Sequence, residues 1–262
     1  MQKISHDEAG QRFWHEQQGL HVVDSIETLL DPTGKTQNLM LTYAVRDGII
    51  SHCGEVRSTV IRPREEAMDL NDIEKPSQYA PYTWEGCVVK IADKIAYLGR
   101  DIEDAVRLGI LKEDGKPLQD LLKELNSYSR EPIQSVTNTS IMYPLITDIC
   151  RESSPEAGLV LSQSHINMMD AVMRFNYAHI YKNKRLEVYH AYARLILESV
   201  YKLLRECYDG TETMNNIRIL AKDYPTLGRH FEKRMKKFSD SGRLEADPDE
   251  YGNKVIYKIS DS

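Results

Sequence analysis

The chain has 262 residues, 41% of them hydrophobic and 28% charged, which is the balance of a globular protein with room for one large or two modest domains. Its formal net charge of −6 gives no indication of nucleic-acid binding, and no apolar run approaches the ~20 residues of a membrane span. The first residues lack the apolar region of a signal peptide, and the four cysteines form no Cys-x-x-Cys pair. We therefore expect a cytoplasmic protein with reduced thiols and no membrane contact.

Helical periodicity dominates the chain, so we predict an all-α fold. We expect helices over residues 13–30, 38–53, 84–109, 116–126, 136–152, 162–183, 185–207, 211–222 and 226–238. The turn sequence at 31–34 ends the first of these, and we expect the long polar connection 54–81 to be an ordered surface excursion. The tail from Ser239 is polar, with one candidate strand at 255–257.

The predicted helix over 84–109 carries the most informative segment. Helical spacing brings Asp93, Tyr97, Arg100, Asp101 and Asp104 onto one face. The opposite face is apolar and consists of Ile91, Ile95, Leu98, Ile102, Ala105 and Val106. The polar face has the groups needed to hold a metal, a phosphate and a sugar hydroxyl together. The alternative is an ordinary solvated face of an amphipathic helix.

Three segments, in chain order, carry a family resemblance. They read FWHEQQGLHVV at 13–23, LTYAVRDGIISH at 41–52 and PYTWEGCVVKIADKIAYLGRDIEDA at 81–105. The third resembles the segment of the HD-domain deoxynucleoside triphosphate triphosphohydrolases (the dGTPase family) that carries the last metal ligand. The first two are similar to segments that precede it in that family. The resemblance is firm from about 13 to 110 and looser through 203.

The resemblance implies an HD-domain-like helical bundle with additional C-terminal helices. Residues 1–126 would form the C-terminal portion of an HD-type catalytic core, and 127–238 a helical extension that completes the substrate pocket and the oligomer contacts. Residues 239–262 would be a loose tail. The implied reaction is hydrolysis of a dNTP, such as dGTP, to deoxynucleoside and tripolyphosphate by a homo-oligomer.

Four residues of the third segment match positions of the family's site. Asp93 matches the final ligand of a divalent ion, either Mg, Mn or another transition metal. Lys94 matches a residue that pairs with the phosphates. Tyr97 and Asp101 match positions that line the sugar, where Asp101 accepts from the 3′-hydroxyl. That contact would reject analogues without the hydroxyl, because the carboxylate would stay buried and unpaired.

Two other segments contribute residues by the same resemblance. His15 and Glu16 match two adjacent positions that lie beside the α-phosphate in the family, where a histidine can donate a proton or orient water. The alternative for His15 is a packed core residue. His6 matches a phosphate-proximal histidine, with an unstructured terminal residue as the alternative. His52 is assigned to the helix scaffold.

The segment 176–181 resembles a later family stretch whose closing residue, here Tyr181, lies near the substrate. The family usually carries a basic residue eight positions earlier. Met173 occupies that position in this chain, and Arg174 follows it, which leaves a phosphate role for Arg174 in doubt.

The family's metal site also needs an early His and an adjacent His-Asp pair upstream of the segment at 13–23. Only one expected ligand of four, Asp93, is therefore present, and we expect the chain as given not to catalyse. Three explanations compete: a start codon assigned too late, a split gene or fragment, and a degenerate homologue. We favour the first two because the substrate-side residues match the family. The alternative functions are a non-catalytic nucleotide-binding or assembly subunit and an HD phosphohydrolase acting on another nucleotide phosphoester.

Overall fold

The computed structural model describes residues 13–53 and 60–239. The chain divides into two compact units, one formed by residues 42–190 and the other by residues 1–41 together with 191–262. His6, the candidate strand at 255–257 and the tail beyond 239 lie outside the described residues, so the predictions made for them stay predictions. The predicted domain boundaries at 126 and 238 fall within the described residues, and they also stay predictions.

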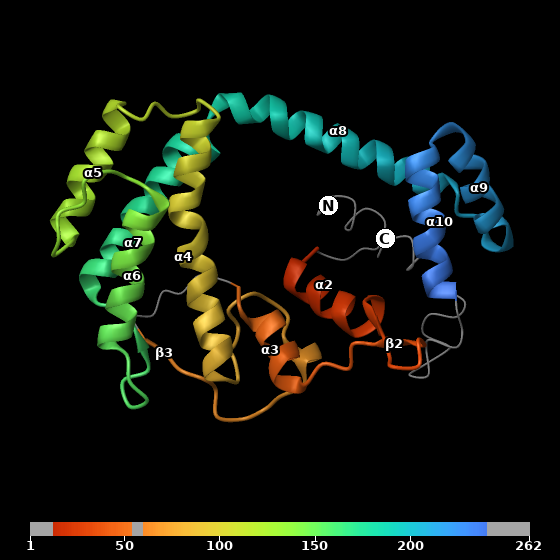
Figure 1. The fold of residues 1–262 in the computed structure, drawn as a ribbon, viewed down its shortest axis with the longest axis horizontal. Helices are drawn as coiled ribbons and strands as arrows, with labels where there is room; N and C mark the ends of the chain where they lie inside the picture. The colour runs from red at the N-terminus through yellow and green to blue at the C-terminus, as the bar shows by residue number, and fades with distance from the viewer. Residues whose placement is uncertain (1–12, 54–59, 240–262) are drawn as a thin grey trace. The chain divides into compact units, whose positions relative to one another are not determined.

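The unit of residues 42–190 is built around one long helix, α4. Its elements are α3 (Tyr43–Ser51), β3 (Val60–Ile61), η2 (Leu70–Asp72), α4 (Trp84–Arg107), α5 (Lys116–Tyr128), α6 (Asn138–Glu152), β4 (Leu159–Val160), α7 (Gln163–Phe175) and η3 (Asn176–Tyr181). Helix α4 contacts α3, α6, α7 and η3, and α5 packs on α7 (Figure 1). The two-residue strands β3 and β4 pair antiparallel, with Val60 opposite Val160. Most elements of this unit thus converge on α4.

Helix α4 forms where local and tertiary signals agree. The Thr83 hydroxyl caps it by accepting a hydrogen bond from the Gly86 amide at 3.1 Å. The predicted apolar face is buried: Ile91, Ile95, Leu98, Ile102 and Ala105 all belong to the main hydrophobic core. Gly99 allows α6 to approach closely, because a Cβ atom there would lie 2.6 Å from Asn138 Cα. The polar face of α4 is therefore held in a fixed orientation by the core behind it.

The segment between α3 and α4 is anchored by a buried ion pair. The Arg64 guanidinium donates to the Asp47 carboxylate and, at 2.5 Å, to the Tyr43 hydroxyl. The Tyr82 amide donates to the same carboxylate at 2.7 Å, and the Arg64 guanidinium lies 5.5 Å from the centre of the Tyr82 ring. Residues 60–81 therefore form the ordered excursion that the sequence predicts, whereas 54–59 lie outside the described part.

The other unit begins with a helix and a hairpin. Its elements are α2 (His15–His21), η1 (Val22–Ile26), β1 (Thr28–Leu30), β2 (Thr36–Asn38), η4 (Gly210–Glu212), α9 (Thr213–Asp223) and α10 (Pro225–Ser239). Helix α9 packs on α10 around a small core that includes Ile217, Phe231 and Met235. Helix α8 (Lys184–Glu206) begins in the first unit and continues into this one.

Two predicted helix ends are wrong because of the hairpin. Residues 28–30 and 36–38 are the paired strands β1 and β2 rather than parts of helices 13–30 and 38–53. The Asp31 carboxylate closes the turn by accepting from the Thr33 and Lys35 amides, both at 2.9 Å, and Gly34 takes a positive φ of 83°. These bonds, led by that from the Thr33 hydroxyl, lower the pKa of Asp31 to about 2.

The remaining predicted helices agree with the structure to within a few residues, and the all-α class is confirmed. One internal difference occurs near the end of the predicted helix 162–183, where residues 176–181 form the π-helical turn η3. None of the described helices combines the length and the apolar composition needed to cross a bilayer. All four cysteines, each within the described ranges, are free thiols.

Candidate functional site

Helix α4 carries the four residues predicted for the site, three of them on its polar face and Lys94 at a buried position. Asp93 is exposed, Lys94 is buried with 8% of its surface accessible, and Tyr97 is 37% exposed. Asp101 follows two turns after Asp93. Arg100 pairs with Asp104, with Nε 3.1 Å from Oδ2. The Asp101 carboxylate has a different partner.

That partner is Tyr181, at the end of η3. The Tyr181 hydroxyl donates a hydrogen bond to Asp101 Oδ2. The turn η3 is held against α4 by Asn176, a buried residue whose side-chain amide donates to the Leu98 carbonyl at 2.9 Å. A π-helical turn shifts the side chains that follow it relative to a regular helix, and such turns are frequent at functional sites. The structure thus brings together two residues predicted from separate sequence segments.

A pocket of about 300 Å³ opens beside this pair. Its lining consists of Tyr97, Met173, Arg174, Asn176, Tyr177 and Tyr181. The Arg174 guanidinium is bound to the Glu124 carboxylate on α5 at 2.8 Å. This ion pair is largely exposed, and the role of Arg174 stays a prediction from sequence. Aromatic walls with a few polar groups are typical of a site that binds a small molecule.

The environment of Tyr181 keeps its phenol protonated. Desolvation, and then the hydrogen bond to the Asp101 carboxylate, raise the pKa of Tyr181 above its usual value of 10.0. Near neutral pH this phenol is consequently a hydrogen-bond donor, and Asp101 is an acceptor. Because its proton is given to Asp101, the Tyr181 oxygen and the second Asp101 oxygen both remain as acceptors, which suits the hydroxyl protons of a sugar.

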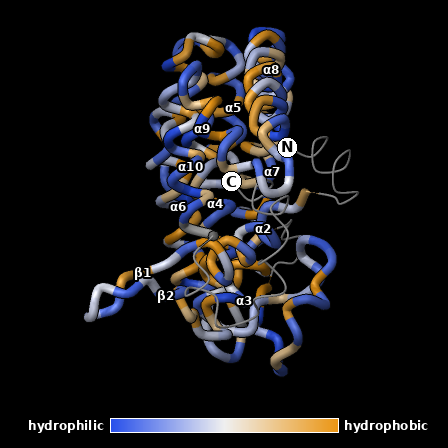
Figure 2. The backbone as a smooth tube through the Cα atoms, turned by 90° about the vertical axis from the view of Figure 1, so that its right-hand side faces the viewer, coloured by the Kyte–Doolittle hydropathy of each residue, from blue (hydrophilic) through white to orange (hydrophobic). Residues whose placement is uncertain are grey.

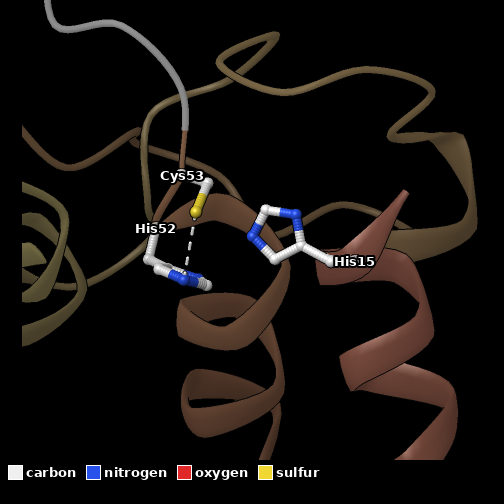
Figure 3. A group of neighbouring side chains, drawn as sticks. All are labelled: His15, His52 and Cys53. Carbon is white, nitrogen blue, oxygen red and sulfur yellow. Dashed lines mark hydrogen bonds between the residues drawn. The ribbon is translucent and has the colours of Figure 1, made fainter. Parts of the chain in front are cut away.

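A second group of polar side chains lies at the start of the same face. Figure 3 shows His52 at the end of α3 and Cys53 beside it, joined by the hydrogen bond between His52 Nε2 and Cys53 Sγ at 3.2 Å. The Cys53 sulfur also lies 3.9 Å from Asp93 Oδ2 on α4. The sequence interpretation missed Cys53; the available signal was its position directly after the segment that ends with His52.

His15, the third residue drawn in Figure 3, belongs to the other unit. Its ring is exposed, and its Nδ1 lies 3.0 Å from Oε2 of Glu16, a carboxylate that is almost fully buried. The roles predicted for His15 and Glu16 stay predictions from sequence.

Comparison with known proteins gives consistent relatives. The chain is 28% identical over 205 residues to the deoxyguanosinetriphosphate triphosphohydrolase-like protein of Clostridium perfringens strain 13, covering 78% of this chain and 50% of the relative. It is 30% identical over 188 residues to the protein of that name from C. perfringens SM101, covering 72% of this chain and 46% of the relative. The chain belongs to the deoxyguanosinetriphosphate triphosphohydrolase-like family. The protein of that name from Clostridium tetani is 28% identical over 181 residues.

This family member spans about half the length of the curated relatives it matches. No family model matches the chain, and no solved structure does. Membership in the triphosphohydrolase-like family therefore rests on the curated relatives.

Proposed function

We propose that this chain contributes the sugar-binding pocket and one metal ligand to an enzyme that hydrolyses dNTPs to deoxynucleoside and tripolyphosphate. The observation that carries the proposal is the convergence of Tyr97, Asp101 and Tyr181. Tyr97 and Asp101 come from one segment with the family resemblance and Tyr181 from another. Tyr97 and Tyr181 line the same pocket, and Asp101 accepts the hydrogen bond from Tyr181.

The pocket suits the nucleoside part of the substrate. A volume of about 300 Å³ is at the lower end of the range for ligand pockets, so it fits a sugar or base better than an entire dNTP. Asp101 uses one carboxylate oxygen for Tyr181, and the carboxylate can accept a further hydrogen bond from the 3′-hydroxyl. The exposed ring of Tyr97 gives an apolar surface against which the sugar can lie.

The spacing along α4 suits the length of the substrate. Asp93 precedes Asp101 by two turns, which separates the two positions by about 12 Å along the helix axis. A sugar at Asp101 therefore places phosphates toward Asp93 and Lys94. Lys94 would neutralise part of their charge, and Asp93 would supply an oxygen ligand to a divalent ion. When bound, such an ion acts as a Lewis acid on phosphate oxygens and lowers the pKa of bound water.

The proposal includes self-association, which the composition of α8 supports. Helix α8, described in full by the structure, has no buried residue. It nevertheless carries large apolar side chains, including Val188, Tyr192 and Leu195, each more than 60% exposed. Figure 2 shows hydrophobic stretches interrupted by hydrophilic ones along this helix. Light scattering on the purified chain measures its oligomeric state; a monomer at all concentrations would remove this part of the proposal.

The test combines binding and product analysis. The purified chain is titrated with the four dNTPs, and deoxynucleotide binding that is weakened in the Asp101→Asn variant is expected. The DNA upstream of the Met1 codon is read for an in-frame His and His-Asp pair, and the correspondingly extended chain is assayed with Mn²⁺ or Mg²⁺. Tripolyphosphate and deoxynucleoside are the expected products.

Two outcomes would favour the alternatives. Release of single phosphate alone would indicate a phosphohydrolase acting on another nucleotide phosphoester. Deoxynucleotide binding without turnover, even in the extended chain, would indicate a non-catalytic binding or assembly subunit.

A further inference from the structure

Two hydrogen bonds join the turn η3 to one short stretch of α4. At the first position of η3, the side-chain amide of Asn176 donates to the Leu98 carbonyl at 2.9 Å. At its last position, the Tyr181 hydroxyl donates to the Asp101 carboxylate. Leu98 and Asp101 are three residues apart on α4, which is about 4.5 Å along its axis. The first and last side chains of η3 therefore face α4 together.

The π-helical geometry of η3 makes this arrangement possible. In a regular α-helix, residues five positions apart are separated by about 140° around the axis, so only one of two such side chains would face α4. In η3 the backbone hydrogen bonds join residues five positions apart, and the Lys182 amide donates in this way to the Tyr177 carbonyl at 3.3 Å. Residues with this spacing then lie nearly above one another. Asn176 and Tyr181 are such a pair.

The Asn176 side chain is buried at some cost to stability. Only 1% of its surface is accessible, and its oxygen Oδ1 accepts no hydrogen bond within the described part of the chain. The Leu98 carbonyl lies in the middle of α4, where it already accepts the amide of the next helical turn. Because an unpaired buried polar atom destabilises a fold, an apolar side chain would serve packing better here. These features favour a role for the amide other than stabilising the fold.

The same amide acts on the Tyr181 phenol. Desolvation and the hydrogen bond to Asp101 raise the pKa of Tyr181, whereas a side-chain hydrogen bond with Asn176 lowers it. A neighbour that donates to a phenol oxygen lowers the pKa because it favours the charged form. A side-chain amide has two protons to donate, and the Leu98 carbonyl takes one of them. The other is therefore directed at the Tyr181 oxygen.

We propose that Asn176 is a positioning residue that fixes the Tyr181 phenol with its proton on Asp101, leaving the other Asp101 oxygen for the ligand. The bond to Leu98 holds the amide in one orientation, because the reverse would set Oδ1 against another acceptor. The amide then occupies one side of the phenol oxygen, and the phenol proton points away from it to Asp101. Asp101 thus accepts in a fixed direction, as discrimination by a hydroxyl group requires. The inference rests on the proposed function for the identity of the ligand, the 3′-hydroxyl of a deoxynucleotide.

The alternative role for Asn176 is that of a tether for η3. In that case the phenol would stay on Asp101 whenever η3 stays packed on α4. The turn has other attachments, because Ile180 and the preceding Phe175 are both buried in the main hydrophobic core. The turn is thus held in place without the amide, and the two roles can be separated by experiment.

Substitution by leucine tests the proposal on the full chain. Asn176→Leu removes both donors and the unpaired oxygen at similar volume, so we expect it to fold. Tyrosine is labelled with ¹³C at Cζ, whose chemical shift reports the hydrogen bonds of the phenol, and Tyr181→Phe identifies the Tyr181 signal. At neutral pH this signal should move in Asn176→Leu in the same direction as in Asp101→Asn, because both lose the bond to the carboxylate. No movement, or movement in the opposite direction as expected for loss of the amide alone, would overturn the proposal.

Nucleotide discrimination gives a second readout. Calorimetric titration with a dNTP and with the matching dideoxynucleotide gives two dissociation constants, whose ratio measures how strongly the 3′-hydroxyl is read. Asn176→Leu should reduce this ratio about 10-fold or more, as Asp101→Asn does, and should change dideoxynucleotide affinity little. Asn126→Leu is the matched control. Asn126 on α5 donates to the Leu122 and Ile133 carbonyls, both at 3.0 Å, and its loss should leave the ratio and the Tyr181 signal unchanged.

A third measurement covers failure of Asn176→Leu to fold. In Tyr181→Phe, which removes only the phenol oxygen, the side-chain amide signal of Asn176 should shift because one of its protons loses its acceptor. An unshifted amide signal would overturn the proposal.

The outcome is separate from that of the proposed function. A chain whose Cζ and amide signals behave as expected, but which binds no deoxynucleotide, keeps the positioning role of Asn176 and removes the proposed ligand. Discrimination that is lost in Asp101→Asn and kept in Asn176→Leu does the reverse.

Discussion

The Tyr181 hydroxyl donates a hydrogen bond to the Asp101 carboxylate, joining α4 to a π-helical turn 80 positions later in the chain. This bond defines one end of the candidate site. It also makes the two residues interdependent, since each sets the hydrogen-bonding state of the other. The first two predictions follow from it.

The first prediction concerns discrimination by the 3′-hydroxyl. In the Asp101→Asn variant, deoxynucleotide affinity should fall by about 1.5–3 kcal/mol, roughly 10- to 150-fold, because a hydrogen bond to a charged acceptor is lost. Dideoxynucleotide affinity should change much less. Asp104→Asn, one turn further along and paired with Arg100, is the matched control. Titration calorimetry measures both ligands, and equal losses for the two would contradict a sugar-binding role.

The second prediction is a pH dependence above the neutral range. The folded-state pKa of Tyr181 is raised above the usual 10.0, so above pH 10 the unfolded chain loses this proton first. Its contribution to stability is therefore complete below pH 10 and is lost as the pH rises through the folded-state pKa. Urea unfolding from pH 9 upward should show a steeper loss of stability for the unmodified chain than for Tyr181→Phe. Tyr143→Phe, an exposed position on α6, should follow the unmodified chain.

The third prediction concerns the anchor of the segment between α3 and α4. Arg64→Met should destabilise the protein by about 3–5 kcal/mol, because it leaves the Asp47 carboxylate buried without its cation. Arg100→Met breaks an exposed pair and should cost at most about 1 kcal/mol. Denaturant unfolding compares the two. Similar losses in both variants would show that the Asp47–Arg64 pair is effectively solvated.

The fourth prediction compares two helix glycines. Gly99→Ala should destabilise the protein by about 1–3 kcal/mol, since the new methyl group would overlap the Asn138 backbone on α6. At Gly48, in the middle of α3, an added Cβ meets no described atom within 4 Å. Gly48→Ala should therefore stabilise the protein by up to about 1 kcal/mol, through reduced freedom of the unfolded chain. Thermal unfolding gives the sign of each change, and a shift in the same direction for both would refute the argument.

Sequence by itself determined the features that depend on local spacing. The two faces of α4 and most helix limits follow from 3.6-residue periodicity and turn chemistry, which act within a few residues. The hairpin at 28–38 escaped prediction because three-residue strands are too short to show alternation, and because the Asp31 side chain, rather than a typical turn pair, closes the turn.

Tertiary structure decided which of these residues meet. The contacts between Asp101 and Tyr181, and between Cys53 and Asp93, join positions 80 and 40 residues apart. No local pattern encodes them, because they depend on how α3 and η3 pack on α4. That packing is set by the fit of apolar side chains behind the polar face, and it divides a row of charges on one helix between two groups of neighbouring side chains.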